Sequence, residues 1–133
     1  MTRYISAAEL LVIHALVVDA TGGSHGVRDA GLLASITERP QARFGGKELH
    51  NDIYMKTAVL VEAAVKYHVF VDGNKRTALA AGGRFLFLNG YELTASNRQA
   101  EEAIFAVAEK RLDEKALAAW FRAHTKRTSS HKK

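Results

Sequence analysis

Two segments of this 133-residue chain are apolar on almost every face of the helix that each would form. Residues 52–68 read DIYMKTAVLVEAAVKYH, and residues 75–89 read KRTALAAGGRFLFLN. A helix that is apolar all round is stable in water only when other elements surround it. The chain is long enough for one ordinary domain and too short for two. We therefore predict a single all-α bundle of about six helices, with these two segments at its centre.

Start and stop signals place the remaining helices. Ser6 and Glu9 have the spacing of a capping box, and they open a helix that the Gly22–Gly23 pair ends. Asp29 can cap a short helix that stops before Pro40, the single proline of the chain. The first central helix, therefore, is the third along the sequence.

Three further caps follow the same logic. Asn51 is the predicted cap of the first central helix, while Ser96 and Asp113 are the predicted caps of two later helices over 97–111 and 114–124. Each is a short polar residue directly before a segment of helical apolar spacing.

Glycine pairs mark two other features. Gly45 and Gly46 lie in the loop over 40–50 and predict a small hairpin. Gly82 and Gly83 lie inside the second central segment, where each weakens an isolated helix by about 1 kcal/mol. We expect this pair to permit a close helix crossing, because glycine lets two backbones approach.

Charge and composition exclude several classes of protein. The formal net charge is +5, but the last eight residues, KRTSSHKK, carry four of these charges and leave +1 for residues 1–125. We expect one domain over 1–125, a basic disordered tail over 126–133, and no specific nucleic-acid partner. No apolar window reaches the length of about 18 residues that a membrane span needs. The absence of cysteine excludes disulfides and thiolate chemistry, and it suits a cytoplasmic protein.

The joint between the central segments begins at His68 and reads HVFVDGNKR. If the second helix starts near Gly73, its first N–H groups form an anion site, to which Lys75 and Arg76 add charge. Asp72 offers an oxygen ligand suited to Mg²⁺ bound together with phosphates. His68 can take a proton from an attacking hydroxyl. The joint therefore combines a phosphate site, a metal ligand and a base.

Each of these residues also has an ordinary explanation when it is taken alone. A histidine there can cap the end of a core helix, Asp-Gly-Asn is a common turn, and Lys-Arg is a common solvated pair. Their coincidence in one short joint favours a functional site. The chain contains no Walker A loop, no H-E-x-x-H and no G-x-S-x-G pattern, and no His/Asp/Glu cluster elsewhere indicates a transition-metal site.

The joint resembles the H-x-F-x-D-x-N-K-R signature of the Fic/Doc superfamily, and more narrowly its death-on-curing (Doc) toxins. The resemblance also includes the glycine-rich segment from residue 22, the FGG of residues 44–46 and the FLFLNGY of residues 85–91. It covers about residues 4–96 and implies an α-helical Fic fold that binds ATP and Mg²⁺ at the joint. By this resemblance, His68 is the general base and Asp72 coordinates Mg²⁺.

The same resemblance assigns the anion hole to Gly73, Asn74 and Arg76, and it makes Lys66 a further candidate for binding the nucleotide. Lys75 stands where AMP-transferring Fic enzymes usually carry glycine, and Leu79 stands where they carry a second arginine. A lysine would occupy space and place charge where the distal phosphates of those enzymes lie. In Doc-type toxins ATP is bound in the reverse sense, which implies transfer of the γ-phosphoryl group to a protein hydroxyl.

The resemblance further implies two partners. The target class of the Doc branch is elongation factor Tu, which a flap at residues 40–50 would dock, although this loop can also be a plain connector. The inhibitory motif [ST]-x-x-x-E-[GN] of some Fic proteins is absent, which is consistent with inhibition by a separate antitoxin. Alternative interpretations are a nucleotidyl (AMP) transferase, a catalytically silent toxin that acts by binding, and a nucleic-acid binder.

Overall fold

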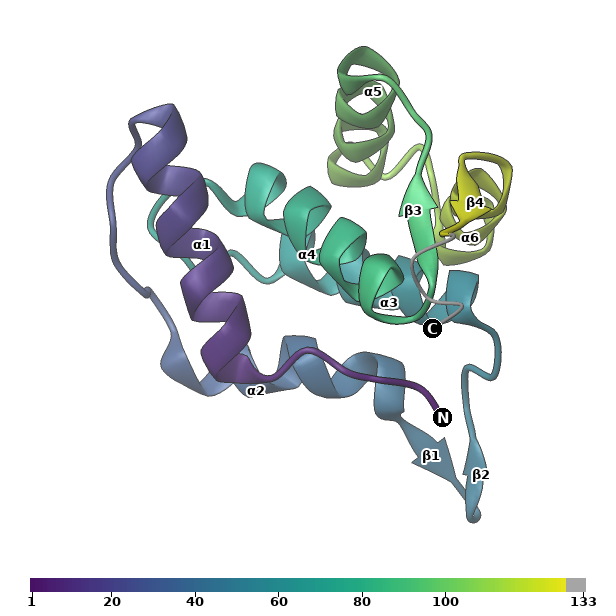
Figure 1. Cartoon of the computed structure of the whole chain (residues 1–133). Helices are drawn as coiled ribbons and strands as arrows, with labels where there is room; N and C mark the ends of the chain where they lie inside the picture. Colours follow the sequence, from purple (N-terminus) through teal and green to yellow (C-terminus); the bar gives the residue numbers. More distant parts are fainter. Residues whose placement is uncertain (129–133) are drawn as a thin grey trace.

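The computed structural model describes residues 1–128, and these form a bundle of six α-helices (Figure 1). The helices are α1 (Ala7–Thr21), α2 (Ala30–Glu38), α3 (Ile53–Lys66), α4 (Asn74–Leu88), α5 (Asn97–Ala108) and α6 (Glu114–Ala123). A 3₁₀ helix, η1 (Arg39–Gln41), follows α2. Short strands form two antiparallel pairs: β1 (Arg43–Phe44) with β2 (Lys47–Glu48), and β3 (Tyr91–Leu93) with β4 (Thr125–Arg127). The predicted all-α architecture with a small hairpin is confirmed.

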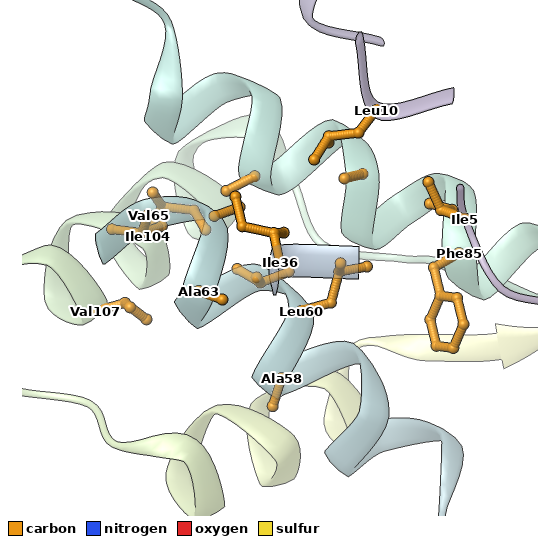
Figure 2. Close-up of a cluster of buried hydrophobic side chains, with 14 of the residues drawn as sticks. Ile5, Leu10, Ile36, Ala58, Leu60, Ala63, Val65, Phe85, Ile104 and Val107 are labelled. Carbon is orange, nitrogen blue, oxygen red and sulfur yellow. The ribbon is translucent and has the colours of Figure 1, made fainter. Parts of the chain in front are cut away.

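Helix α3 lies inside the bundle, as its apolar sequence requires. It packs most extensively on α4 and α6, and α1 lies against α4. In the core, Leu60 and Val65 of α3 join one hydrophobic cluster with Leu10 of α1, Phe85 of α4 and Ile104 of α5 (Figure 2). Because helices that are distant in sequence supply this cluster, α3 is held from several sides, and its C-terminal end has a fixed position.

Side-chain caps set the starts of α1, α2, α5 and α6. The Ser6 hydroxyl accepts the N–H of Glu9 at 3.1 Å, and the Glu9 carboxylate accepts the N–H of Ser6 at 3.0 Å, which completes the predicted capping box. Asp29, Ser96 and Asp113 cap α2, α5 and α6, also as predicted. These polar contacts replace the hydrogen bonds that the first N–H groups of a helix lack.

The predicted cap of α3 is wrong by one residue. The carboxylate of Asp52 accepts the N–H of Met55 at 2.8 Å, and the helix begins at Ile53. A capping side chain reaches the N–H two or three residues beyond it, and Asp52 has that spacing from the first helical turn. Asn51 lies outside the helix, so two adjacent residues with good capping side chains made the sequence ambiguous.

The C-terminal boundary also differs from the prediction. Lys126 and Arg127, which the sequence places in the tail, pair with Glu92 and Tyr91 in the β3–β4 sheet. The Arg127 guanidinium lies 5.1 Å from the centroid of the Tyr91 ring. This strand is basic and has no apolar alternation, so no local pattern indicates it. The remainder of the predicted tail, residues 129–133, lies outside the described residues.

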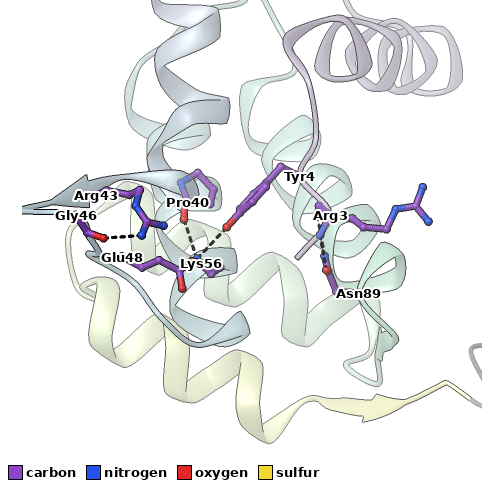
Figure 3. Close-up of polar contacts among 8 residues, drawn as sticks. All are labelled: Arg3, Tyr4, Pro40, Arg43, Gly46, Glu48, Lys56 and Asn89. Carbon is purple, nitrogen blue, oxygen red and sulfur yellow. Dashed lines mark hydrogen bonds and ion pairs between the residues drawn. The ribbon is translucent and has the colours of Figure 1, made fainter. Parts of the chain in front are cut away.

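A buried lysine attaches the β1–β2 hairpin to the bundle. Lys56 of α3 is 3% exposed, and its ammonium donates to the Tyr4 hydroxyl at 3.0 Å, the Pro40 carbonyl at 3.2 Å and the Glu48 carboxylate at 2.7 Å (Figure 3). Burial lowers the pKa of Lys56, but the hydrogen bonds with Glu48 and Tyr4 raise it, and the net shift is upward. The ammonium therefore stays charged and links the hairpin to the N-terminal segment through α3.

Among residues 1–128, no helix combines the length and the apolar character needed to cross a membrane.

Gly82 lies where α4 crosses α3 closely. A Cβ at Gly82 would lie 2.6 Å from Cγ2 of Val61, which is closer than side-chain carbons approach one another. At Gly83, a Cβ would lie 3.6 Å from Cδ1 of Leu93, an ordinary contact. The crossing therefore explains Gly82, as predicted, but it does not require Gly83.

The two adjacent glycines provide a matched test of this crossing. Gly82→Ala should lower the free energy of unfolding by about 1–3 kcal/mol, because the methyl group must displace Val61. Gly83→Ala should raise it by about 0.5–1 kcal/mol, because alanine favours a helix and has space there. Urea titrations monitored by circular dichroism would measure both. Stabilisation by both substitutions would contradict the close crossing.

Candidate active site

A cavity of about 900 Å³ opens at the joint between α3 and α4. Its size is within the range of small-molecule binding sites. Every residue that the sequence assigned to the site lines this cavity: Lys66, His68, Asp72, Gly73, Asn74, Lys75 and Arg76. The end of α1 and the turn after α5 supply other parts of the lining.

The start of α4 provides the phosphate-binding part of the cavity. Gly73 is the N-cap and has a left-handed backbone (φ 75°), a conformation that glycine adopts without steric cost. No side chain caps this N-terminal end of α4. The N–H groups of Asn74, Lys75 and Arg76 therefore have no partner within the helix and remain available to an anion.

The joint is closed by the side chain of Asn74. Its Nδ2 donates to the carbonyl of Phe70 at 2.9 Å, and its Oδ1 accepts the N–H of Phe70 at 3.1 Å. Because Phe70 is buried in the core, this pair of bonds fixes the joint relative to the bundle. The side chain of Asn74 is thus occupied within the joint, and its backbone N–H is the group left for a ligand.

The loop between α1 and α2 lies against the joint. The N–H of Val71 donates to the carbonyl of Gly26 at 3.0 Å, and the N–H of Arg28 donates to the carbonyl of Val69 at 2.6 Å. These bonds accompany an isolated antiparallel bridge between Val27 and Phe70. The loop is therefore held against the joint, and its first residues, Gly22 and Gly23, line the cavity.

Asp72 has a carboxylate that two backbone N–H groups orient. Oδ1 accepts the N–H of Gly73 at 2.9 Å, and Oδ2 accepts the N–H of Ser24 at 3.2 Å. A Cβ at Gly23 would lie 2.9 Å from Oδ2, so glycine lets the backbone approach this carboxylate. Each oxygen keeps a further lone pair for a cation.

The donor set fits Mg²⁺ that is held together with phosphates. Residues 1–128 contain no group of three or more His, Cys, Asp or Glu residues that could bind a metal ion by themselves. Mg²⁺ is commonly bound by one or two carboxylates, with phosphates and water completing its coordination. Asp72 can supply the protein's share of such a site.

His68 is exposed at the cavity and has a left-handed backbone (φ 50°). It lies two residues beyond the end of α3, and Tyr67 is the C-cap of that helix. Within the described part of the chain its side chain makes no hydrogen bond, so a capping role is not observed. A non-glycine residue in this conformation carries a steric cost, and such residues occur often in functional sites.

The sequence did not identify His14, which supports the joint from α1. It is 4% exposed, and its Nε2 lies 2.8 Å from the carbonyl oxygen of Asp72. Since a carbonyl only accepts, Nε2 is the protonated nitrogen. The ring stacks on Phe70 with centroids 3.8 Å apart and planes 6° apart. In the sequence, His14 looked like one more residue on the buried face of a helix.

The cations of the cavity differ in their partners. The ammonium of Lys66 donates to the Glu62 carboxylate at 3.2 Å. The pKa of Glu62 is raised, mainly by burial and secondly by a hydrogen bond with Glu114. The ammonium of Lys75 lies 5.8 Å from the ring centroid of Phe105 on α5. The cavity is therefore basic, and two of its cations are already oriented by neighbours.

Two other cations at the cavity have no side-chain partner within residues 1–128. They are Arg76, which the sequence assigned to the site, and Lys110, which it did not. Lys110 follows α5 and is distant from the joint in sequence, so no local motif could have identified it.

Comparison with known proteins gives a consistent result. The Fic/DOC family matches residues 4–86. A protein named Toxin Doc, from Mycolicibacterium smegmatis, is 37% identical over 121 residues, which cover 90% of this chain and 91% of that protein. A protein named Protein kinase doc, from Escherichia phage P1, is 35% identical over 104 residues, or 78% of this chain and 82% of that protein.

The contact between His14 and Asp72 can be separated from the stacking on Phe70. His14→Phe keeps an aromatic ring and removes the donor, whereas His14→Gln keeps an N–H at the position of Nε2. We expect His14→Phe to lower the free energy of unfolding by about 1–3 kcal/mol, because the Asp72 carbonyl loses its partner. It should also accelerate hydrogen exchange of the Gly73 amide more than His14→Gln does. Equal exchange in the two variants would show that the ring, and not the hydrogen bond, holds the joint.

Proposed function

The chain belongs to the Fic/DOC family, and from this premise we propose that it is a Doc-type toxin that phosphorylates a protein. In this proposal it transfers the γ-phosphoryl group of ATP to a hydroxyl of a translation factor, with elongation factor Tu as the target. The observation that carries the proposal is the cavity at the α3–α4 joint. It brings His68, the Asp72 carboxylate and the uncapped start of α4 together with Lys75 and Arg76.

The nucleotide would bind with its phosphates at the start of α4. The N–H groups of the first turn and the guanidinium of Arg76 suit an anion there. Mg²⁺ bound to Asp72 would neutralise part of the phosphate charge. Because two backbone N–H groups already orient this carboxylate, little reorganisation is needed when the nucleotide binds.

His68 would act as the general base. Its ring takes the proton of the target hydroxyl, and the hydroxyl oxygen forms a bond to the γ-phosphorus. The bond from that phosphorus to the β–γ bridging oxygen breaks, and ADP leaves. The exposed position of His68 supports this role, because the hydroxyl belongs to a second protein that must reach the ring.

The exposed β1–β2 hairpin, with Phe44 on its surface, is a candidate contact for that protein.

The choice between phosphoryl and AMP transfer depends on Lys75 and Leu79. Lys75 lines the cavity, and its charge suits a phosphate bound in the reverse sense. Leu79 packs against the hydrophobic core, at the position where AMP-transferring relatives would have an arginine. The name of the phage P1 relative agrees with a kinase. AMP transfer is the alternative enzymatic function.

A cognate antitoxin is the proposed regulatory partner. A shallow, largely apolar cavity of about 490 Å³ lies between α1 and α4 and includes Val12, Leu16 and Ala80. Val12 is 58% exposed and Leu16 is 64% exposed. A helical segment with an apolar face would suit this surface. A catalytically silent toxin that acts by such docking alone would not need the constellation at the joint.

With elongation factor Tu as the target, the place of action is the bacterial cytoplasm.

Intact-mass spectrometry of elongation factor Tu, incubated with this protein and Mg·ATP, tests the reaction. We expect a gain of one phosphoryl group. His68→Ala should slow this transfer by about 100-fold or more, because the proton acceptor is removed. Its fold should be unchanged, since the ring has no partner among the described residues. A gain of one AMP would instead establish AMP transfer. Toxicity on expression is the second measurement, and a His68→Ala variant as toxic as the unaltered chain would favour action by docking.

Lys75→Gly tests the orientation of the nucleotide. Loss of a charged hydrogen bond to phosphate should reduce phosphoryl transfer by about tenfold to a hundredfold. Lys115→Gly, at the second residue of α6 and outside the lining of the cavity, is the control for loss of one positive charge from the first turn of a helix. The products of both variants would be quantified by mass. Unchanged phosphoryl transfer by Lys75→Gly would refute the role given to Lys75.

A further inference from the structure

Lys110 lines the same cavity from an element that the family match does not include. The match ends at residue 86, whereas Lys110 lies in the turn between α5 and α6. Its side chain is exposed, and within residues 1–128 it forms neither an ion pair nor a hydrogen bond. The side chain is therefore free to take a ligand in the cavity.

The backbone at Lys110 is unfavourable for lysine. Its φ is 63°, and the turn is closed by two bonds, from the Lys110 N–H to the Val107 carbonyl at 3.0 Å and from the Arg111 N–H to the Ala106 carbonyl at 2.8 Å. This is the pattern by which many helices end, and the left-handed position in it is usually glycine. Any side chain with a Cβ carries a steric cost there. The turn itself therefore gains nothing from lysine.

The charges around the cavity indicate what the side chain would bind. Lys66 is paired with Glu62, and Lys75 lies over the ring of Phe105. Arg76 and Lys110 are the cavity cations without a partner in the described residues, and they come from different elements. An anion bound at the start of α4 would leave negative charge that a second, flexible cation could reach. A lysine provides this as a mobile point charge.

We propose that Lys110 is a phosphate-binding residue, and that its ammonium contacts the polyphosphate of the nucleotide from the α5–α6 turn. This inference rests on the proposed nucleotide site, but it does not depend on which protein is the target or on which group is transferred. It predicts opposite effects of one substitution on stability and on binding, which a purely structural role would not produce.

The test compares Lys110→Gly with the unaltered 133-residue chain. The variant should have a higher Tm, because glycine relieves the left-handed position. Its Kd for a non-hydrolysable ATP analogue with Mg²⁺, measured by isothermal titration calorimetry, should be weaker by about threefold to tenfold. Binding of ADP should weaken as well, and binding of adenosine should not change. Lys110→Arg should retain most of the affinity.

Two controls make the result specific. Arg111→Ala removes the neighbouring positive charge, which pairs with Glu109 and does not line the cavity, and it should leave the Kd unchanged. Lys110→Asn is a second neutral variant that tolerates the left-handed backbone, and it should weaken binding like Lys110→Gly. Unchanged ATP affinity in both neutral variants would overturn the role of Lys110 and leave the proposed function intact. Equal weakening for adenosine would also overturn it, and no ATP binding by the unaltered chain would overturn both proposals.

Discussion

The packing of α3 against its neighbours is the constraint on which the other features depend. This helix has too much apolar surface to lie at the edge of the molecule, and α2, α4, α5 and α6 pack around it. The close crossing at Gly82 holds α4 directly on α3. As a result, the end of α3 and the start of α4 are both fixed in space. The short chain between them buries Phe70 in the core and leaves His68 and Asp72 exposed.

The joint itself is held by polar contacts to its backbone. Phe70 is buried in the core, and Asn74 closes the chain around it with two hydrogen bonds. From α1, His14 stacks on the same ring and donates to the Asp72 carbonyl. These contacts leave the Asp72 carboxylate, the ring of His68 and the first N–H groups of α4 accessible at the cavity. The side chains that support the joint and those that would do chemistry are thus different residues, and substitutions can separate their effects.

The central helices and the cavity at their joint, which the assigned residues line, were predictable because both depend on local sequence. Apolar segments longer than a strand indicate buried helices, and the residues from His68 to Arg76 are neighbours in the chain as well as in space. The features that were not predictable depend on distant contacts. His14 is ordinary until the fold brings it to Asp72, and the basic β4 strand is defined by its pairing with β3. Asn51 and Asp52 are adjacent and both are good caps, so the sequence alone does not decide between them, and the structure shows that Asp52 caps α3.

The cavity also divides along the sequence in a way that bears on how specificity arises. The segment that matches the Fic/DOC family, residues 4–86, supplies the candidate base, the metal ligand and the start of α4. The following segment supplies Phe105, which orients Lys75, and the turn that carries Lys110. If the proposed function is correct, the reacting groups come from the first segment, and the cations that orient the nucleotide depend partly on the second. Changes in α5 could then alter how ATP is held without altering His68 or Asp72, so relatives with the same motif need not bind the nucleotide in the same way.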